Sequence, residues 1–171
     1  MKGVAVVYKA SDLVVYGSHG VCTIVEIECK KVDNKLVEYY VLEPVHQPGA
    51  RYYIPTGNPL AVSKMNAIMN RDELLAMLQD PSLRVSCWID DENMRKLRYK
   101  ELIIGADRRA LLQMVHTLVM QKDLCAASGK KFHQCDENFL KDAQKLLDCE
   151  ISIVLGMPQS DVRPYVESIF C

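Results

Sequence analysis

Two kinds of hydrophobic pattern divide this 171-residue chain. Up to about residue 55, apolar residues form short runs rich in β-branched and aromatic side chains, and glycine, proline and asparagine separate the runs. This pattern predicts strands joined by turns. Beyond that point apolar residues recur at spacings of three and four, which predicts amphipathic helices. Strands followed by helices predict an α+β fold.

The first part is expected to form a small twisted barrel. Strands are predicted at 13–16, 21–28, 37–42 and 51–54, with turns at 17–20 and around Asp33-Asn34. A small barrel of this kind commonly leaves a strand edge free for a partner. The tyrosines of this part either fill its core or contact a ligand. In the second strand, Val21, Thr23, Val25 and Ile27 are expected on one face and Cys22, Ile24, Glu26 and Glu28 on the other.

The second part is expected to be an all-α domain. The breaker-rich segment Pro55–Pro59 marks the joint, and the predicted domains are residues 1–62 and 63–171. Helices are predicted over 72–78, from a cap at Asp107, from near Asp136 to Gly156, and from Ser160 onward. The helix after Asp107 carries an apolar stripe of Leu111, Met114, Val115 and Leu118.

Composition and charge narrow the class of protein. Nearly half of the residues are hydrophobic and a quarter are charged, as in ordinary globular proteins. No segment approaches the roughly 20 apolar residues of a membrane span. The opening Met1–Tyr8 is too short for a signal peptide, so we expect a cytoplasmic protein. The net charge of -1 excludes a general nucleic-acid coat, but the basic run 94–100 leaves a local basic face possible.

Motifs for catalysis or metal binding are weak. Seven cysteines show no C-x-x-C pair, and most are expected to be reduced thiols. Zinc held by Cys125, His133, Cys135 and Cys149 is the alternative, although their predicted elements differ. His19 lies in a turn without an acidic or nucleophilic partner in sight. Because no phosphate-binding loop, metalloprotease motif or nucleophile elbow occurs, we expect no enzyme activity, no cofactor and no metal.

The segment from Asp12 to Val21, DLVVYGSHGV, resembles the opening of the CarD family of transcription regulators. Members of that family begin with a G-D-x-V-V-Y-x-x-H-G-like run, and Ser11 stands in place of the usual glycine. A related barrel occurs in transcription-repair coupling factors. Trp88, the basic run after it, and the helix opened at Asp107 follow the family's order, so the resemblance extends over about residues 10–170.

The resemblance implies a bacterial regulator that binds RNA polymerase at promoters. A Tudor-like, SH3-like barrel would hold the polymerase β subunit. Lys30 takes the place of one basic side chain used there, and Tyr53 takes that of another, with Arg51 near enough to substitute. The helical domain would contact promoter DNA at the upstream edge of the bubble without reading sequence. Trp88 would wedge into the minor groove, with phosphate contacts from Arg95, Lys96, Arg98, Lys100, Lys130 and Lys131.

Two alternatives stay open at this stage. Trp88 could be buried between helices, and the basic run could be a solvated helix face without a ligand. The acidic run Asp90-Asp91-Glu92 disfavours DNA beside Trp88. The whole chain could then be a protein-only adaptor that links RNA polymerase, or another protein, to a second protein. In either case we expect a monomer that does not bind membranes.

Overall fold

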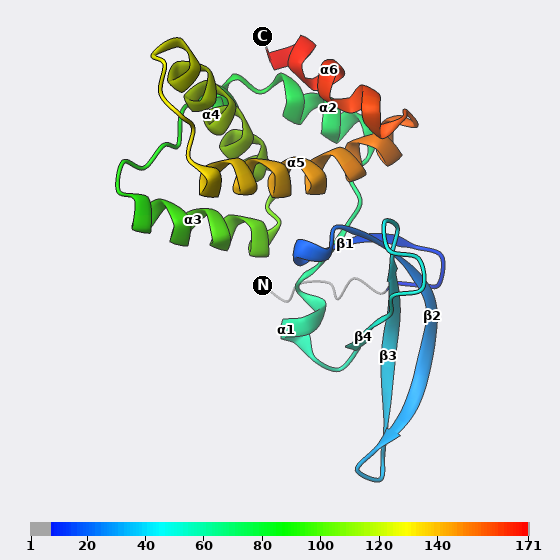
Figure 1. The fold of residues 1–171 in the computed structure, drawn as a ribbon. Coiled ribbons are helices and arrows are strands. Elements are labelled where there is room, and N and C mark those ends of the chain that lie inside the picture. The colour runs from blue at the N-terminus through cyan, green and yellow to red at the C-terminus, as the bar shows by residue number, and fades with distance from the viewer. Residues whose placement is uncertain (1–7, 171) are drawn as a thin grey trace. The chain divides into compact units, whose positions relative to one another are not determined.

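A computed structural model describes residues 8–170 of the chain (Figure 1). The expectations stated for the opening segment before Tyr8, and for Cys171, lie outside these residues. The chain divides between Ile68 and Met69 into two compact units, here called the sheet unit and the helical unit. Strand β5 places this division a few residues beyond the predicted joint, because its residues Met65–Ala67 pair with the first strand.

The sheet unit is a five-stranded antiparallel sheet in the order β4-β3-β2-β1-β5. Its other strands are β1 (Leu13–Tyr16), β2 (Val21–Val32), β3 (Lys35–Pro44) and β4 (Tyr52–Pro55), and α1 (Pro59–Val62) precedes β5. Asp33 and Asn34 both adopt positive φ and join β2 to β3, as the sequence predicted. Among the described residues the strand pairing ends at β4 and β5, so it defines a sheet and not a closed barrel.

A β-bulge changes which residues of β2 face the core. The pairing with β3 shifts between Ile24 and Glu26, which leaves Val25 without a partner. Cys22 and Ile24 before the bulge are fully buried, whereas Ile27 after it lies opposite the buried Tyr40. The predicted strict alternation along β2 is therefore wrong beyond Ile24. As a result, the residues from Glu26 onward lie on the opposite face from the one that strict alternation assigns.

The helical unit contains α2 (Arg71–Gln79), α3 (Glu92–Gly105), α4 (Arg108–Ala127), α5 (Gln134–Leu155) and α6 (Gln159–Phe170). Helix α5 packs against each of the other four helices. Local signals fix the helix ends: Asp107 accepts hydrogen bonds from the first turn of α4, and Gly156 ends α5 in the left-handed conformation. The stripe predicted for α4 is buried.

The interior of the helical unit is apolar, with a few charged groups enclosed in it. Apolar residues of α2, α4 and α5 form most of the core, together with Tyr99 of α3 and two valines of α6. Among the described residues, no helix is both long enough and apolar enough to cross a bilayer. Three buried acidic residues of α5 face inward, and each is paired with an arginine: Asp136, Asp148 and Glu150.

Candidate functional site

The first candidate surface lies on the outer face of the sheet unit. The bulge in β2 directs Glu26, Glu28 and Lys30 to the same face as Tyr39 of β3, because Glu28 lies opposite Tyr39. Across β3, Tyr53 of β4 lies opposite Val41, which itself pairs with Glu26. We call Glu26, Glu28, Lys30, Tyr39, Arg51 and Tyr53 the sheet-face cluster.

Each of the three residues predicted to face polymerase has a partner within the sheet-face cluster. The Lys30 ammonium lies 3.6 Å from the centre of the Tyr53 ring. It also lies 3.4 Å from Glu28, and Arg51 donates to Glu26 at 2.9 Å. Both pairs are about half exposed, so they hold the side chains in place without removing their charges from solvent. The result is an exposed tyrosine in contact with one cation, on a face that also carries the Arg51–Glu26 pair.

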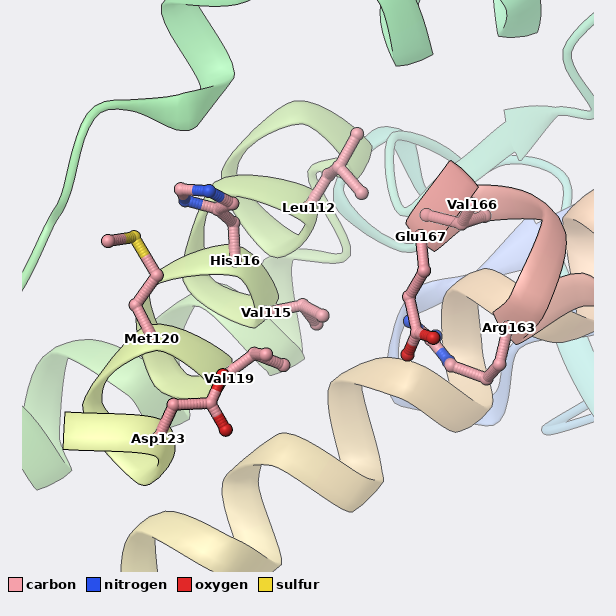
Figure 2. A pocket seen from close by; sticks show the side chains of 9 residues that line it. All are labelled: Leu112, Val115, His116, Val119, Met120, Asp123, Arg163, Val166 and Glu167. Atoms are coloured by element: carbon pink, nitrogen blue, oxygen red, sulfur yellow. The ribbon is translucent and has the colours of Figure 1, made fainter. Parts of the chain in front are cut away.

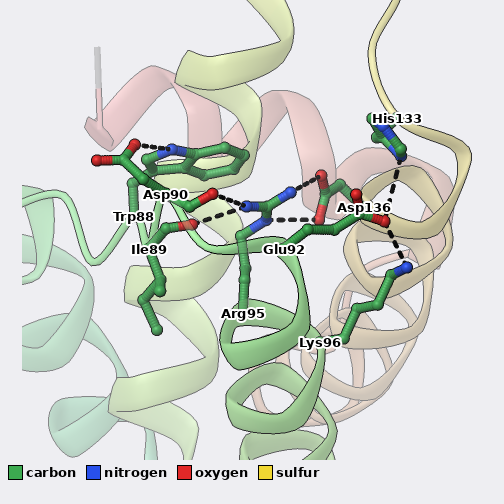
Figure 3. A network of polar contacts seen from close by, with 8 residues as sticks. All are labelled: Trp88, Ile89, Asp90, Glu92, Arg95, Lys96, His133 and Asp136. Carbon is green, nitrogen blue, oxygen red and sulfur yellow. Dashed lines mark hydrogen bonds and ion pairs between the residues drawn. The ribbon is translucent and has the colours of Figure 1, made fainter.

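The second candidate surface surrounds Trp88 in the loop that precedes α3 (Figure 3). Trp88 is half-buried and packs against the core of the helical unit. Its indole N–H donates to Asp90 Oδ1 at 3.1 Å, and the guanidinium of Arg95 lies 4.1 Å from the centre of its ring. We call Trp88, Asp90, Arg95 and Asp136 the tryptophan cluster.

Arg95 is an internal residue, which revises the phosphate contact predicted for it. Its side chain is only 5% exposed and makes two parallel hydrogen bonds to Asp136, at 3.0 and 2.9 Å. These hydrogen bonds raise the pKa of Arg95 above its ordinary value, so the guanidinium stays charged. A buried cation that is already neutralised by a carboxylate releases no counterion from DNA.

The other predicted DNA contacts fall into two groups. Lys96 pairs with Glu92, which lowers the pKa of Glu92, and Arg98 lies 3.5 Å from Glu101. Lys100, Lys130 and Lys131 are exposed, and within the described part of the chain they form no ion pair. His133 follows the two lysines of the α4–α5 connection and lies 3.9 Å from Glu92, so this connection reaches the start of α3 near Trp88.

Sequence reasoning missed the partners that hold these residues. Asp136 lies in the first turn of α5, where a helix start was predicted, but it also pairs with Arg95, 41 positions away, and no local pattern indicates this contact. Asp90 was interpreted as a charge opposing DNA, whereas it also accepts the indole hydrogen bond. The i, i+2 spacing of Glu26, Glu28 and Lys30 does predict that they share one face of the strand. Which face they occupy depends on the bulge.

A pocket of about 170 Å³ lies between α4 and α6 (Figure 2). Leu112, Val115 and Val166 line it with apolar atoms, while Asp123 and Glu167 lie at its rim. It is smaller than the several hundred Å³ typical of small-molecule sites. Among the described residues, no group of three or more His, Cys, Asp or Glu side chains could hold a metal ion.

Comparison with known families decides the identity of the sheet unit. Residues 8–66 match the family described as the CarD-like/TRCF RID domain. The sheet unit is a CarD-like RID domain. This confirms the predicted resemblance for the sheet unit, and the RID domain is an RNA polymerase-interacting domain. The match ends within the sheet unit. No curated protein matches the chain.

Proposed function

We propose that this chain is a bacterial, cytoplasmic and non-enzymatic transcription regulator. Its RID domain, a Tudor-like domain, binds the RNA polymerase β subunit. Its helical unit contacts promoter DNA at the upstream edge of the bubble and stabilises the open complex. One monomer makes both contacts, and the DNA contact does not depend on sequence.

The observation that carries the proposal is the position of the sheet-face cluster inside the matched domain. Lys30, Arg51 and Tyr53 lie within residues 8–66 and on one face of the sheet. Exposed charges of both signs around an aromatic ring favour a protein partner, since such patches steer association and supply an anchor. Strand β4, which carries Tyr53, pairs only with β3 among the described residues, so its other edge can receive a partner strand.

The geometry of Trp88 supports the DNA contact. A half-buried aromatic ring fixed at the surface of a helical unit has the properties of a wedge for a base step. Lys100, Lys130 and Lys131 are the cations most available to phosphates. With only about three such contacts, the free protein should bind DNA no more tightly than the usual non-specific range of about 10⁻⁴ to 10⁻⁶ M. Attachment to polymerase raises the effective concentration of the helical unit at DNA to the order of mM.

One observation favours the second candidate function, a protein-only adaptor. Asp90 and Asp91 are exposed beside Trp88, and Asp90 accepts the indole N–H. Carboxylates at this position repel phosphates. In the adaptor, Trp88 would anchor a second protein, which is a common role for an aromatic residue at an interface.

The test is capture of RNA polymerase by the full chain, followed by promoter footprinting. Arg51→Glu should reduce capture, because it replaces an exposed cation of the sheet-face cluster and disrupts its pair with Glu26. Arg71→Glu is the matched control, since Arg71 is an exposed arginine of α2, and it should capture polymerase normally. Trp88→Ala should capture polymerase but lose the footprint at the upstream edge of the bubble. Normal capture without any footprint from the unaltered chain would support the adaptor instead.

A further inference from the structure

The guanidinium of Arg95 contacts the ring of Trp88 and also donates hydrogen bonds to one carboxylate and to two backbone carbonyls. Its Nε and Nη2 groups donate to the two carboxylate oxygens of Asp136 on α5. Its Nη1 group donates to the backbone carbonyl of Ile89 at 2.7 Å and to that of Asp90 at 3.3 Å. These two carbonyls belong to the residues that directly follow Trp88, so Arg95 fixes the backbone of the loop as well as the ring (Figure 3).

The carboxylate of Asp136 fixes the orientation of the Arg95 guanidinium. Asp136 is 3% exposed at its side chain, and two parallel hydrogen bonds to a planar guanidinium allow only one relative orientation. The Cζ atom of Arg95 lies over the Trp88 ring, 4.1 Å from its centre, and the indole N–H donates to Asp90 at 3.1 Å. Both the face and the edge of the indole therefore have a fixed partner.

We propose that Arg95 and Asp136 are positioning residues that preset the orientation of Trp88 for its ligand. This inference rests on the proposed contact of Trp88 with promoter DNA. In it, Arg95 touches no phosphate and acts only through Trp88. A ring that is ordered before binding loses less side-chain entropy when it inserts, and an ordering cost of this kind corresponds to about a two- to tenfold change in affinity.

A double substitution tests the proposal without leaving a buried charge. Arg95→Met together with Asp136→Leu replaces the ion pair with apolar side chains of similar size, an exchange that buried pairs often tolerate. Arg95→Lys is the second variant, because it keeps the charge but cannot make the bidentate contact or present a planar group to the ring. Arg71→Met, at an exposed position outside the tryptophan cluster, is the control.

The readout is the fluorescence of Trp88, which is the only tryptophan in the chain. Acrylamide quenching should increase and fluorescence anisotropy should fall in both test variants, and neither should change in Arg71→Met. Far-UV circular dichroism should show that the helices remain folded. If the double variant does not fold, Arg95→Lys alone decides the result. Unchanged quenching and anisotropy in a folded test variant would overturn the proposal.

Promoter complexes give the second readout. The folded test variants should capture RNA polymerase as the unaltered chain does, but stabilise the open complex about two- to tenfold less. Full stabilisation despite a loosened Trp88 would also overturn the inference. If the proposed function itself is wrong, the result differs, because Trp88→Ala would then stabilise the open complex to the same extent as the unaltered chain does. In that case the promoter readout would reject the role at DNA, and the fluorescence would still report whether Arg95 orders Trp88.

Discussion

The substitution Glu150→Gln should destabilise the helical unit far more than the same substitution elsewhere on α5. Glu150 is 3% exposed at its side chain and accepts hydrogen bonds from Arg108 at 2.7 Å and from the backbone N–H of Met69 at 2.9 Å. It thus attaches the first residue of the helical unit to its central helix. The amide can still accept from Met69, so the main loss is the charge opposite Arg108.

The magnitude follows from burial. Removing one partner of a fully buried ion pair costs about 3–5 kcal/mol. Arg108 is 20% exposed and can recover part of its hydration, so we expect Glu150→Gln to cost about 2–3 kcal/mol. The matched control is Glu137→Gln on the same helix. Glu137 pairs with Lys122, which is 48% exposed, and pairs of this kind contribute about 0.2–1 kcal/mol.

Urea unfolding followed by Trp88 fluorescence measures both variants. Because the only tryptophan lies in the helical unit, its signal reports that unit even if the two units unfold separately. Glu150→Gln should lower the free energy of unfolding by at least about 1 kcal/mol more than Glu137→Gln does. Equal effects of the two substitutions would refute the argument from burial.

Three further outcomes follow from individual contacts. The hydroxyl of Tyr99 is fully buried and has no hydrogen-bond partner among the described residues. Tyr99→Phe should therefore stabilise the helical unit by about 1 kcal/mol and raise its melting temperature by about 4 °C. A lower melting temperature would contradict this expectation. Burial, and then the charge of Arg84, lower the pKa of His116 below 6.5, so His116 contributes stability above pH 6.5 that is lost as pH falls through the lowered value. Between pH 7 and pH 5 the melting temperature of His116→Gln should therefore fall less than that of the unaltered chain, and parallel curves would be the opposite result. Binding of the free chain to promoter and random duplexes across a salt series should be weak and equal, with a slope of log K against log salt near about -3; nanomolar, sequence-selective binding would contradict the tethered contact.

The parts of the fold that the sequence predicted are those determined by local chemistry. Asp107 caps α4 through its own side chain, and Gly156 ends α5 because it adopts positive φ without steric cost. Asp33-Asn34 forms the β2–β3 turn for a similar reason, since both residues tolerate the left-handed region. Each of these signals lies within a few residues of the feature that it determines.

The features that were missed depend on residues far apart in the chain. Strand β5 exists because it pairs with β1, and its three residues show no strand pattern of their own. The bulge at Val25 reverses the faces of β2, and the adjacent apolar residues Ile24 and Val25 do not show by themselves where the reversal occurs. Arg95 stands in a run of cations that looks solvated, and only the position of Asp136 on another helix makes its burial possible.

The lifetime of promoter complexes tests the central claim most directly. RNA polymerase is assembled on a promoter with the full chain, with Trp88→Ala or with Arg51→Glu, and the decay of the open complex is followed after a competitor is added. The unaltered chain should prolong the lifetime. Trp88→Ala should remain bound to polymerase without prolonging the lifetime, and Arg51→Glu should prolong it less because it binds polymerase more weakly. A Trp88→Ala protein that prolongs the lifetime as fully as the unaltered chain would contradict the account.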